Sequence, residues 1–252
     1  MFDFKDQVVL ITGAGSPNGM GRVFAADFAK LGAKVVLVDI DQKGIDANVG
    51  ELKNAGFNAS GYVANLTDEE AVKKLVSDVV SAEGRIDVLI NNAGISQKVT
   101  VADMTLADIQ RIFTVNMFGL FLLTREVCEV MKEQNYGRIV HLSSVSAKRG
   151  GGVFGGAHYS ASKAAVLGFS KNLAREVSQY GITTNCVAPG LINTHIWKSM
   201  PEEEAQKVID QIPMGRAGEP EEVSAAVVFL ASKEASYITG EEIDINGGSH
   251  MD

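Results

Sequence analysis

The segment VVLITGAGSPNGMG, residues 8–21, runs from an apolar stretch directly into a glycine-rich loop. Its spacing departs from both common phosphate-binding patterns. A G-x-G-x-x-G fingerprint starting at Gly13 requires a third glycine where the chain has Asn18, and a G-x-x-x-x-G-K-[ST] loop requires a lysine that is absent here. The following segment 21–31, GRVFAADFAKL, has helical periodicity and stops at Gly32. The stretch therefore predicts a strand, a glycine-rich loop and a helix in succession.

Five more apolar runs have the length and composition of buried strands: VVLV (35–38), VLIN (88–91), RIVHL (138–142), TTNCVA (183–188) and EIDI (242–245). Longer segments with helical periodicity lie between most of them. Short apolar strands separated by helices favour a parallel sheet that is covered on both faces. No repeat or linker divides the chain, whose 252 residues can bury the core of one domain. We therefore predict a doubly wound, Rossmann-type α/β fold in which residues 1–252 form a single domain.

Composition narrows the possible functions. The chain is 46% hydrophobic and 21% charged, with a net charge of −8. An acidic chain without a cluster of Lys and Arg is unsuited to a phosphate backbone, so we expect no nucleic-acid partner. The sequence has no signal-peptide pattern and no apolar stretch that approaches a spanning helix, and Cys128 and Cys186 fit no metal spacing. We expect a cytoplasmic protein with reduced cysteines, no membrane association and no metal site.

Two helix starts are marked near the C-terminus. Residues 199–202, SMPE, form a capping-box pattern that leads an apolar series up to Pro213, and Pro220 opens a second helix. The first helix follows the end of a strand, where an open α/β sheet gathers its ligands. Residues 191–215 are therefore either a lid over a substrate site or an ordinary surface helix.

Asp39 ends the second predicted strand, 18 residues beyond Gly21. At this place in a dinucleotide-binding unit, a carboxylate accepts hydrogen bonds from the hydroxyls of the adenosine ribose. The same charge repels a 2′-phosphate, and no Arg or Lys at 14–20 or 39–42 offsets it. Unless Asp39 is only an acidic turn residue, the sequence predicts NAD(H) rather than NADP(H) as the cofactor.

The segment YSASK, residues 159–163, places a phenol and an ammonium four residues apart on one face of a helix. A free tyrosine has a pKa of about 10, which makes it a poor proton donor and acceptor at neutral pH. Lowering that pKa to about 7 takes about 4 kcal/mol of preferential stabilisation of the phenolate. Lys163 and an oxidised nicotinamide ring could supply it together. Because such pairs are also common on exposed helices, their meaning depends on the rest of the chain.

Several further motifs occur in a fixed order: TGxxxxxGxG after the first strand, NNAG (91–94), Asn116 in VNMFGLF, Ser144 after RIVHLS, YSASK, NCVAPG (185–190) and INGG (245–248). Together they closely resemble the tyrosine-dependent short-chain dehydrogenase/reductase family, of the classical single-domain kind. The resemblance covers essentially the whole chain.

This resemblance implies a role for each matched position. Tyr159 is the expected catalytic acid and base, Lys163 lowers its pKa and holds the nicotinamide ribose, and Asn116 leads to a proton-relay water. Ser144 binds the substrate oxygen where charge develops. Contacts with NAD are implied for the following residues: Gly13, Asn18, Gly19, Met20, Asp39, Asn65, Leu66, Asn92, Ala93, Gly94, Tyr159, Lys163, Pro189, Gly190, Ile192 and Thr194.

Two positions depart from the family pattern near the cofactor. Five residues instead of three separate Gly13 from Gly19, so we expect residues 16–18 to bulge outward beside the phosphates. Asn65 stands where the family usually has an Asp near the adenine, and an amide can still bond the ring.

Two serines, Ser144 and Ser146, are candidates for the catalytic position. The usual separation of 13 residues would select Ser146, whereas Ser144 lies 15 residues before Tyr159. We assign Ser144 because RIVHLSS marks the end of a strand and the glycine-rich loop that follows can absorb two residues. His158 either lines the pocket or packs beside it.

The resemblance favours an NAD-dependent enzyme that interconverts a secondary alcohol and its ketone. Two alternatives stay open: a 3-oxoacyl-carrier-protein reductase of the same family, and a dinucleotide-sensing regulator without turnover. The reductases typically favour NADPH, contrary to Asp39. Substrate specificity is expected to depend on Val153, Phe154, Ile196, Trp197 and Met200. The apolar segment 117–131 must bury more than one face, and the family commonly forms tetramers, so we expect a homotetramer.

Overall fold

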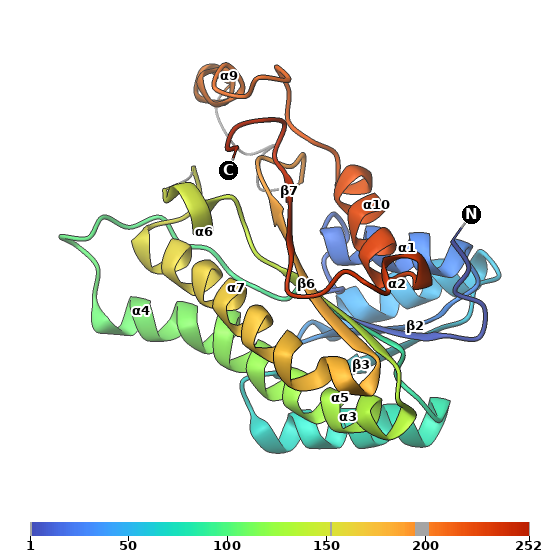
Figure 1. Ribbon diagram of the computed structural model, residues 1–252. Helices are drawn as coiled ribbons and strands as arrows, with labels where there is room; N and C mark the ends of the chain where they lie inside the picture. The colour runs from blue at the N-terminus through green and yellow to red at the C-terminus, as the bar shows by residue number, and fades with distance from the viewer. Residues whose placement is uncertain (1, 152, 195–201, 252) are drawn as a thin grey trace.

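The computed structural model describes residues 2–151, 153–194 and 202–251. In these residues seven parallel strands form one sheet in the order β3-β2-β1-β4-β5-β6-β7 (Figure 1). The strands are β1 (Val8–Thr12), β2 (Lys34–Asp39), β3 (Ala59–Val63), β4 (Val88–Asn91), β5 (Gly137–Leu142), β6 (Ile182–Pro189) and β7 (Glu242–Ile245). The chain order reverses between β1 and β4, which creates a topological switch point at the carboxyl edge of the sheet. The predicted doubly wound, Rossmann-type fold is confirmed.

Helices cover both faces of the sheet (Figure 1). One face carries α1 (Met20–Lys30), α2 (Gln42–Asn54) and α10 (Pro220–Ala231). The other face carries α3 (Glu69–Glu83), α5 (Leu120–Gln134) and α7 (Ala157–Val177). The remaining helical elements are α4 (Leu106–Phe113), the π-helical turn η1 (Thr114–Gly119), α6 (Ser146–Arg149), η2 (Ser178–Tyr180), α9 (Glu202–Ile209) and η3 (Lys233–Ala235). In Figure 1, α9 lies at the top, and α6 lies on the left above the start of α7; in the chain α6 follows the carboxyl end of β5.

All six apolar runs are strands, but they leave out β3. Its sequence, ASGYV, alternates between buried and exposed residues because β3 is an edge strand and one of its faces is only partly covered. At Gly61 a side chain would collide with Ile45 of α2, since a Cβ there would lie 2.4 Å from the Ile45 Cγ2 atom. The strand is therefore held by close packing with α2 rather than by a continuous apolar sequence.

Two of the three predicted helix starts are confirmed, and the third lies partly outside the described residues. α1 covers the segment 21–31 to within one residue at each end, and Pro220 opens α10, where Glu219 and Glu222 form a capping box. Residues 199–201 of the other predicted capping box lie outside the described residues. The helix that they were expected to open, α9, begins at Glu202 and ends at Ile209, short of Pro213.

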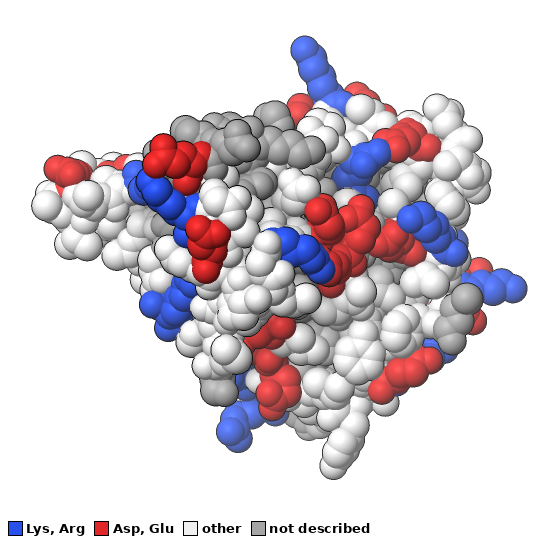
Figure 2. Space-filling model, turned by 90° about the horizontal axis from the view of Figure 1, so that it is seen from above, with Lys and Arg blue, Asp and Glu red and all other residues white. Residues whose placement is uncertain are grey.

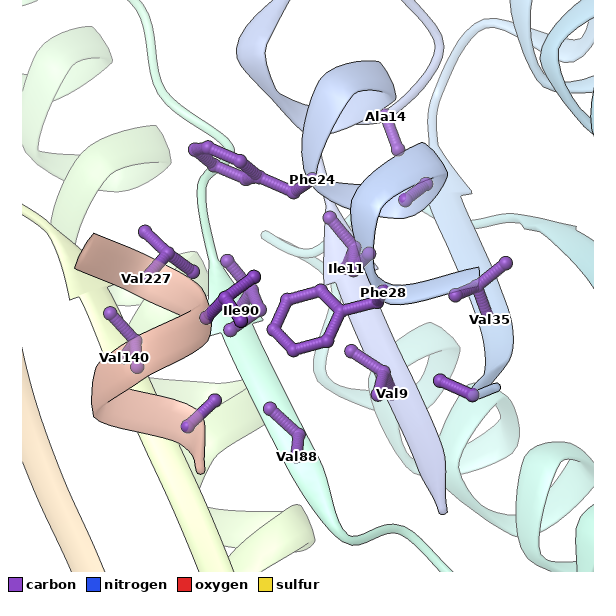
Figure 3. Close-up of a cluster of buried hydrophobic side chains, with 14 of the residues drawn as sticks. Val9, Ile11, Ala14, Phe24, Phe28, Val35, Val88, Ile90, Val140 and Val227 are labelled. Atoms are coloured by element: carbon purple, nitrogen blue, oxygen red, sulfur yellow. The ribbon is translucent and has the colours of Figure 1, made fainter. Parts of the chain in front are cut away.

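A buried cluster between the sheet and α1 holds the first strand–loop–helix unit together. Figure 3 shows Phe28 of α1 lying over the sheet near Val9 and Ile90, with Val227 of α10 beside them. Phe28 also makes an edge-to-face contact with Phe4, with ring centroids 4.9 Å apart. This packing fixes the N-terminus of α1 at the carboxyl edge of the sheet.

The continuous helical segment Leu106–Gln134, formed by α4, η1 and α5, is long and apolar enough to cross a membrane by length and composition alone. The expectation that no apolar stretch approaches this length was therefore wrong for the helix as a whole. Its apolar window is 28% buried, and α5 packs Leu123, Val127 and Met131 against the rest of the fold. The opposite side of the η1–α5 segment leaves Phe118 and Phe121 exposed.

Candidate active site

The glycine-rich loop joins β1 to α1 at the switch point, and close packing explains two of its glycines. Gly13 has a φ of +64°, and a Cβ there would lie 2.8 Å from the Ala93 Cα atom. A Cβ on Gly21 would lie 2.6 Å from the carbonyl oxygen of Gly13. Residues 16–18 are exposed, as expected for the longer loop. α1 begins after Gly19 without a side-chain cap or an acidic first turn, which leaves its amides suited to an anion such as a pyrophosphate.

Three polar side chains hold this loop in place. The buried amide of Asn48, on α2, donates to the carbonyl oxygen of Ala14 at 2.7 Å. The Thr12 hydroxyl accepts from the backbone N–H groups of Asn92 and Ala93, both at 3.0 Å. The Asn92 amide donates to the carbonyl oxygen of Thr12 at 2.8 Å. Sequence analysis placed Asn92 beside the cofactor but did not single out Asn48 or Thr12, because their partners lie on other elements.

A cavity of about 180 Å³ lies above the ends of β2, β3 and β4. It brings together six of the residues predicted to contact the cofactor: Gly13, Asp39, Asn65, Leu66, Ala93 and Gly94. The Asp39 carboxylate accepts from the N–H groups of Gly15 at 2.8 Å, Ile40 at 2.7 Å and Asp41 at 3.2 Å. Among the described residues no Lys or Arg forms an ion pair with Asp39. The negative charge is thus held in a defined position at the cavity wall.

Asn65 lies in the same wall and is exposed. Its side-chain oxygen accepts from the N–H of Thr67 at 3.1 Å and from the Thr67 hydroxyl at 2.8 Å. These bonds orient the amide and leave its NH₂ group as the donor toward solvent and cavity. The amide therefore offers a donor where the family's Asp would offer an acceptor.

Tyr159 and Ser144 meet at the end of β5. Ser144 follows β5, and Tyr159 lies in the first turn of α7. Burial raises the pKa of Tyr159, and a hydrogen bond with the Ser144 side chain opposes that rise. The Ser144 hydroxyl also accepts from the N–H of Ser146 at 3.2 Å. Of the two candidate serines, Ser144 is the one bonded to Tyr159, while Ser146 begins α6 and helps to orient Ser144.

Lys163 lies one turn after Tyr159 and is buried. Its ammonium donates to the carbonyl oxygen of Leu142, the last residue of β5, at 2.7 Å. Burial lowers the pKa of Lys163 to about 8. The group thus remains mostly protonated at pH 7, although removing it from water makes the charge costly.

Asn116 occupies the wide π-helical turn between α4 and α5, a feature often found at functional sites. Its side chain bonds both backbone groups of Ile95, accepting from the N–H at 2.8 Å and donating to the carbonyl at 2.9 Å. A Cβ on Gly94 would lie 3.3 Å from both the Asn116 Oδ1 atom and the Lys163 Nζ atom. The structure therefore brings Asn116, Lys163 and Gly94 together behind Tyr159.

A second cavity, of about 210 Å³, opens beside Ser144 and Tyr159. Six residues predicted to contact the cofactor line it: Met20, Tyr159, Pro189, Gly190, Ile192 and Thr194. Val153 and Phe154 of the expected specificity residues also line it, whereas Ile196, Trp197 and Met200 lie outside the described residues. Among the described lining residues that were not predicted for this site, Arg149 is the one with a charged side chain. The two cavities flank the switch point along the carboxyl edge, an arrangement that suits an extended dinucleotide.

His158 packs beside this cavity rather than lining it. It is buried, and its Nε2 atom lies 3.2 Å from the side-chain oxygen of Gln97. The Gln97 amide donates in turn to Asp108 at 2.6 Å. The pKa of Asp108 is lowered to about 2, chiefly by hydrogen bonds from Thr105 and Gln97. His158 therefore links α7 to the segment that follows β4.

The comparisons with known proteins show the family of the chain. A sequence model described as Enoyl-(Acyl carrier protein) reductase matches residues 13–250. The chain belongs to the short-chain dehydrogenase/reductase family. The chain is similar to the 3-oxoacyl-[acyl-carrier-protein] reductase FabG of Thermotoga maritima, with 41% identity over 97% of this chain and 98% of the relative. It is also similar to the (2S)-[(R)-hydroxy(phenyl)methyl]succinyl-CoA dehydrogenase subunit BbsD of Thauera aromatica, with 39% identity over 98% of both chains.

Solved structures of family members have the same fold over nearly their whole length. The crystal structure of gox2181 superposes with a TM-score of 0.94 at 33% identity, covering 98% of this chain and 96% of that one. The crystal structure of levodione reductase superposes with a TM-score of 0.92 at 37% identity, covering 97% and 98%. The protein is thus an oxidoreductase of a family that uses a nicotinamide cofactor.

Proposed function

We propose that this short-chain dehydrogenase/reductase interconverts a secondary alcohol and its ketone with NAD(H). The observation that carries the proposal is the hydrogen bond between Ser144 and Tyr159 at the mouth of a cavity, with Lys163 and Asn116 immediately behind. A hydroxyl pair beside a buried cation can hold a carbonyl oxygen and give or take its proton. When bound, the nicotinamide ring supplies or accepts the hydride.

The proton is handled by Tyr159. In reduction, its hydroxyl donates the proton to the substrate oxygen while the Ser144 hydroxyl bonds the same oxygen. In oxidation, the phenolate accepts the proton of the alcohol as the hydride leaves the carbon. Because burial raises the pKa of Tyr159, the phenolate depends on nearby positive charge. The Lys163 ammonium, with a pKa of about 8, is protonated at pH 7 and can provide part of that charge.

The residues around the two cavities fit the proposed cofactor. The uncapped start of α1 would hold the pyrophosphate, and Asp39 would accept hydrogen bonds from the adenosine ribose hydroxyls. The Asp39 carboxylate faces the 180 Å³ cavity without a paired cation among the described residues, so a 2′-phosphate would meet an uncompensated negative charge. This favours NAD(H) over NADP(H).

A Tyr159→Phe variant tests the proposed chemistry. It should still bind NADH, measured by the change in NADH fluorescence, and lose turnover on a panel of secondary alcohols and ketones. Tyr237→Phe is the matched control because Tyr237 is fully exposed. Turnover by Tyr159→Phe at more than about a hundredth of the wild-type rate would refute the assignment, since general acid–base catalysis contributes about 10²–10⁴-fold. If the wild type binds NADH and turns over no compound of the panel, this result favours the alternative of a dinucleotide-sensing regulator over an enzyme.

A second candidate is reduction of a 3-oxoacyl group carried as a thioester. Its support is the printed name of the Thermotoga maritima relative, a 3-oxoacyl-[acyl-carrier-protein] reductase, at 41% identity. The two candidates differ in carrier and in cofactor. Rapid NADPH-linked reduction of an acetoacetyl thioester would favour the second candidate, and a preference for NADH with small ketones would favour the first.

We also propose that the protein is a homotetramer in the cytoplasm. Phe118 and Phe121, on the outer side of the η1–α5 segment, are 56% and 45% exposed, and a second copy would cover them. Cys128 and Cys186 are free and buried, and burial raises the pKa of each thiol to about 12, as suits inert thiols in a reducing compartment. Sedimentation as a monomer at micromolar concentration would refute the oligomer.

A further inference from the structure

The cavity beside Ser144 and Tyr159 contains one charged side chain in its described lining, that of Arg149. The other described lining residues are apolar or carry a hydroxyl group, as Tyr159 does. A guanidinium keeps its charge at any pH the protein tolerates. A substrate that reaches the Tyr159 hydroxyl therefore shares the cavity with a permanent positive charge.

Arg149 is held on a short, anchored helix. It is the last residue of α6, which starts two residues after Ser144, and Gly150, with a φ of +70°, turns the chain away. The preceding Lys148 forms ion pairs with Glu242 at 3.3 Å and Asp244 at 2.9 Å on β7. These pairs tie α6 to the edge of the sheet and neutralise the charge of Lys148.

The charge of Arg149 is not neutralised in this way. Its Nη1 atom donates to the backbone carbonyl oxygen of Ser249 at 3.2 Å, and it forms no ion pair with any described carboxylate. Four other arginines do pair with a carboxylate: Arg22, Arg85, Arg125 and Arg216. Figure 2, which is seen from above Figure 1, shows several basic side chains lying next to acidic ones among mostly uncharged residues. Arg149 thus keeps donors and a net charge for a ligand in a chain of net charge −8.

We infer that the substrate carries a carboxylate, which Arg149 binds while the oxygen of the reacting carbon lies between Ser144 and Tyr159. A guanidinium matches a carboxylate with two parallel hydrogen bonds. The single positive charge in the described lining balances one carboxylate, whereas a phosphate dianion would bring a second negative charge that no other described lining residue offsets. The inference rests on the proposed function and narrows its substrate class to a short hydroxy acid and the corresponding oxo acid.

The test compares oxo acids with their neutral amides. The probes are 2-oxo, 3-oxo and 4-oxo acids of four to six carbons, each paired with the amide of the same skeleton, so that shape is kept and charge is removed. With NADH, the wild type should reduce the best acid with a kcat/KM at least tenfold above that of its amide. Arg149→Gln should abolish this ratio chiefly through KM, and Arg149→Lys should retain part of it. Lys53→Gln, an exposed site on α2 that loses the same charge, should keep the wild-type ratio.

Each outcome bears on the inference separately from the proposed function. Equal use of acids and amides by the wild type, or a ratio unchanged in Arg149→Gln, overturns the carboxylate and leaves the proposed function standing. Reduction of neutral ketones without reduction of any of the acids also overturns the carboxylate and leaves the proposed function standing. A strong preference for a coenzyme A thioester over the free acid, lost in Arg149→Gln, also overturns it and assigns the guanidinium to a phosphate. Failure on every substrate, including the alcohol panel, refutes the proposed function and the inference together.

Discussion

Replacement of Lys163 by methionine should make the protein more stable at pH 7 while removing its activity. The ammonium is buried, and burial lowers its pKa from 10.5 to about 8. One pKa unit corresponds to about 1.4 kcal/mol, so keeping this charge in the folded protein costs about 3 kcal/mol at pH 7. Methionine has a similar shape and no charge. It also removes the hydrogen bond to the carbonyl oxygen of Leu142, which is worth about 1 kcal/mol.

The net gain at pH 7 is therefore about 2 kcal/mol, or about 4–8 °C in melting temperature for a chain of this size. The sign of the pH dependence follows from the lowered pKa. Below about pH 8 the folded wild type carries the full cost of the buried charge. Between about pH 8 and 10.5 the unfolded chain binds more protons than the folded one, so the wild type gains stability as the pH rises. By pH 10 the stability advantage of Lys163→Met should fall to about zero, because the lost hydrogen bond then offsets the remaining cost of the buried charge.

Urea unfolding at pH 7 and pH 10, at one protein concentration, measures this difference, and NADH-linked turnover is measured on the same samples. Lys171→Met is the matched control: Lys171 lies on the same helix but is exposed, so its removal should shift neither value by more than about 0.5 kcal/mol. A Lys163→Met protein that is less stable than the wild type at pH 7, by an amount that is the same at pH 10, would refute the reasoning. That result would mean that the buried ammonium stabilises the folded protein instead of destabilising it.

Four further substitutions probe the site and the fold. Asp39→Ser should lower the ratio of kcat/KM for NADH to that for NADPH at least tenfold, or about 1.4 kcal/mol, because it removes the charge that faces the 2′ position; an unchanged ratio contradicts this. Ser144→Ala should reduce kcat about 10²-fold or more, as loss of an oxyanion donor does, whereas Ser146→Ala should have a small effect; the reverse order would reassign the serine. Phe121→Glu should dissociate the oligomer, as read by sedimentation, since it places a charge in the proposed interface. Phe28→Ala should cost about 3–5 kcal/mol in urea unfolding, because it opens a cavity in the core beneath α1, and a loss under 1 kcal/mol would speak against that packing.

Local patterns predicted those parts of the fold whose burial is continuous. The apolar runs of β1, β2, β4, β5 and β6 mark them directly, since a parallel strand covered on both faces has no polar alternation. The edge strand β7 alternates acidic residues with isoleucines and was found by this pattern. The other edge strand, β3, was not predicted because ASGYV has only small or isolated apolar residues and its packing depends on α2 and Gly61. The length of the helix through η1 was also underestimated. The sequence has no single uninterrupted apolar run to show that α4 and α5 form one continuous helical segment.

The sequence by itself determined the strand–loop–helix unit at residues 8–31, the single parallel α/β domain, and the Tyr159 and Lys163 pair on one helix. These features depend on neighbours within one or two turns of chain, where spacing alone sets which side chains share a face. Only the tertiary structure decided that Ser144 rather than Ser146 bonds Tyr159 and that Arg149 lines the cavity without an ion pair to a described carboxylate. Those contacts are made across loops and between separate elements, so they follow from strand order and packing, about which the local pattern of residues carries no information.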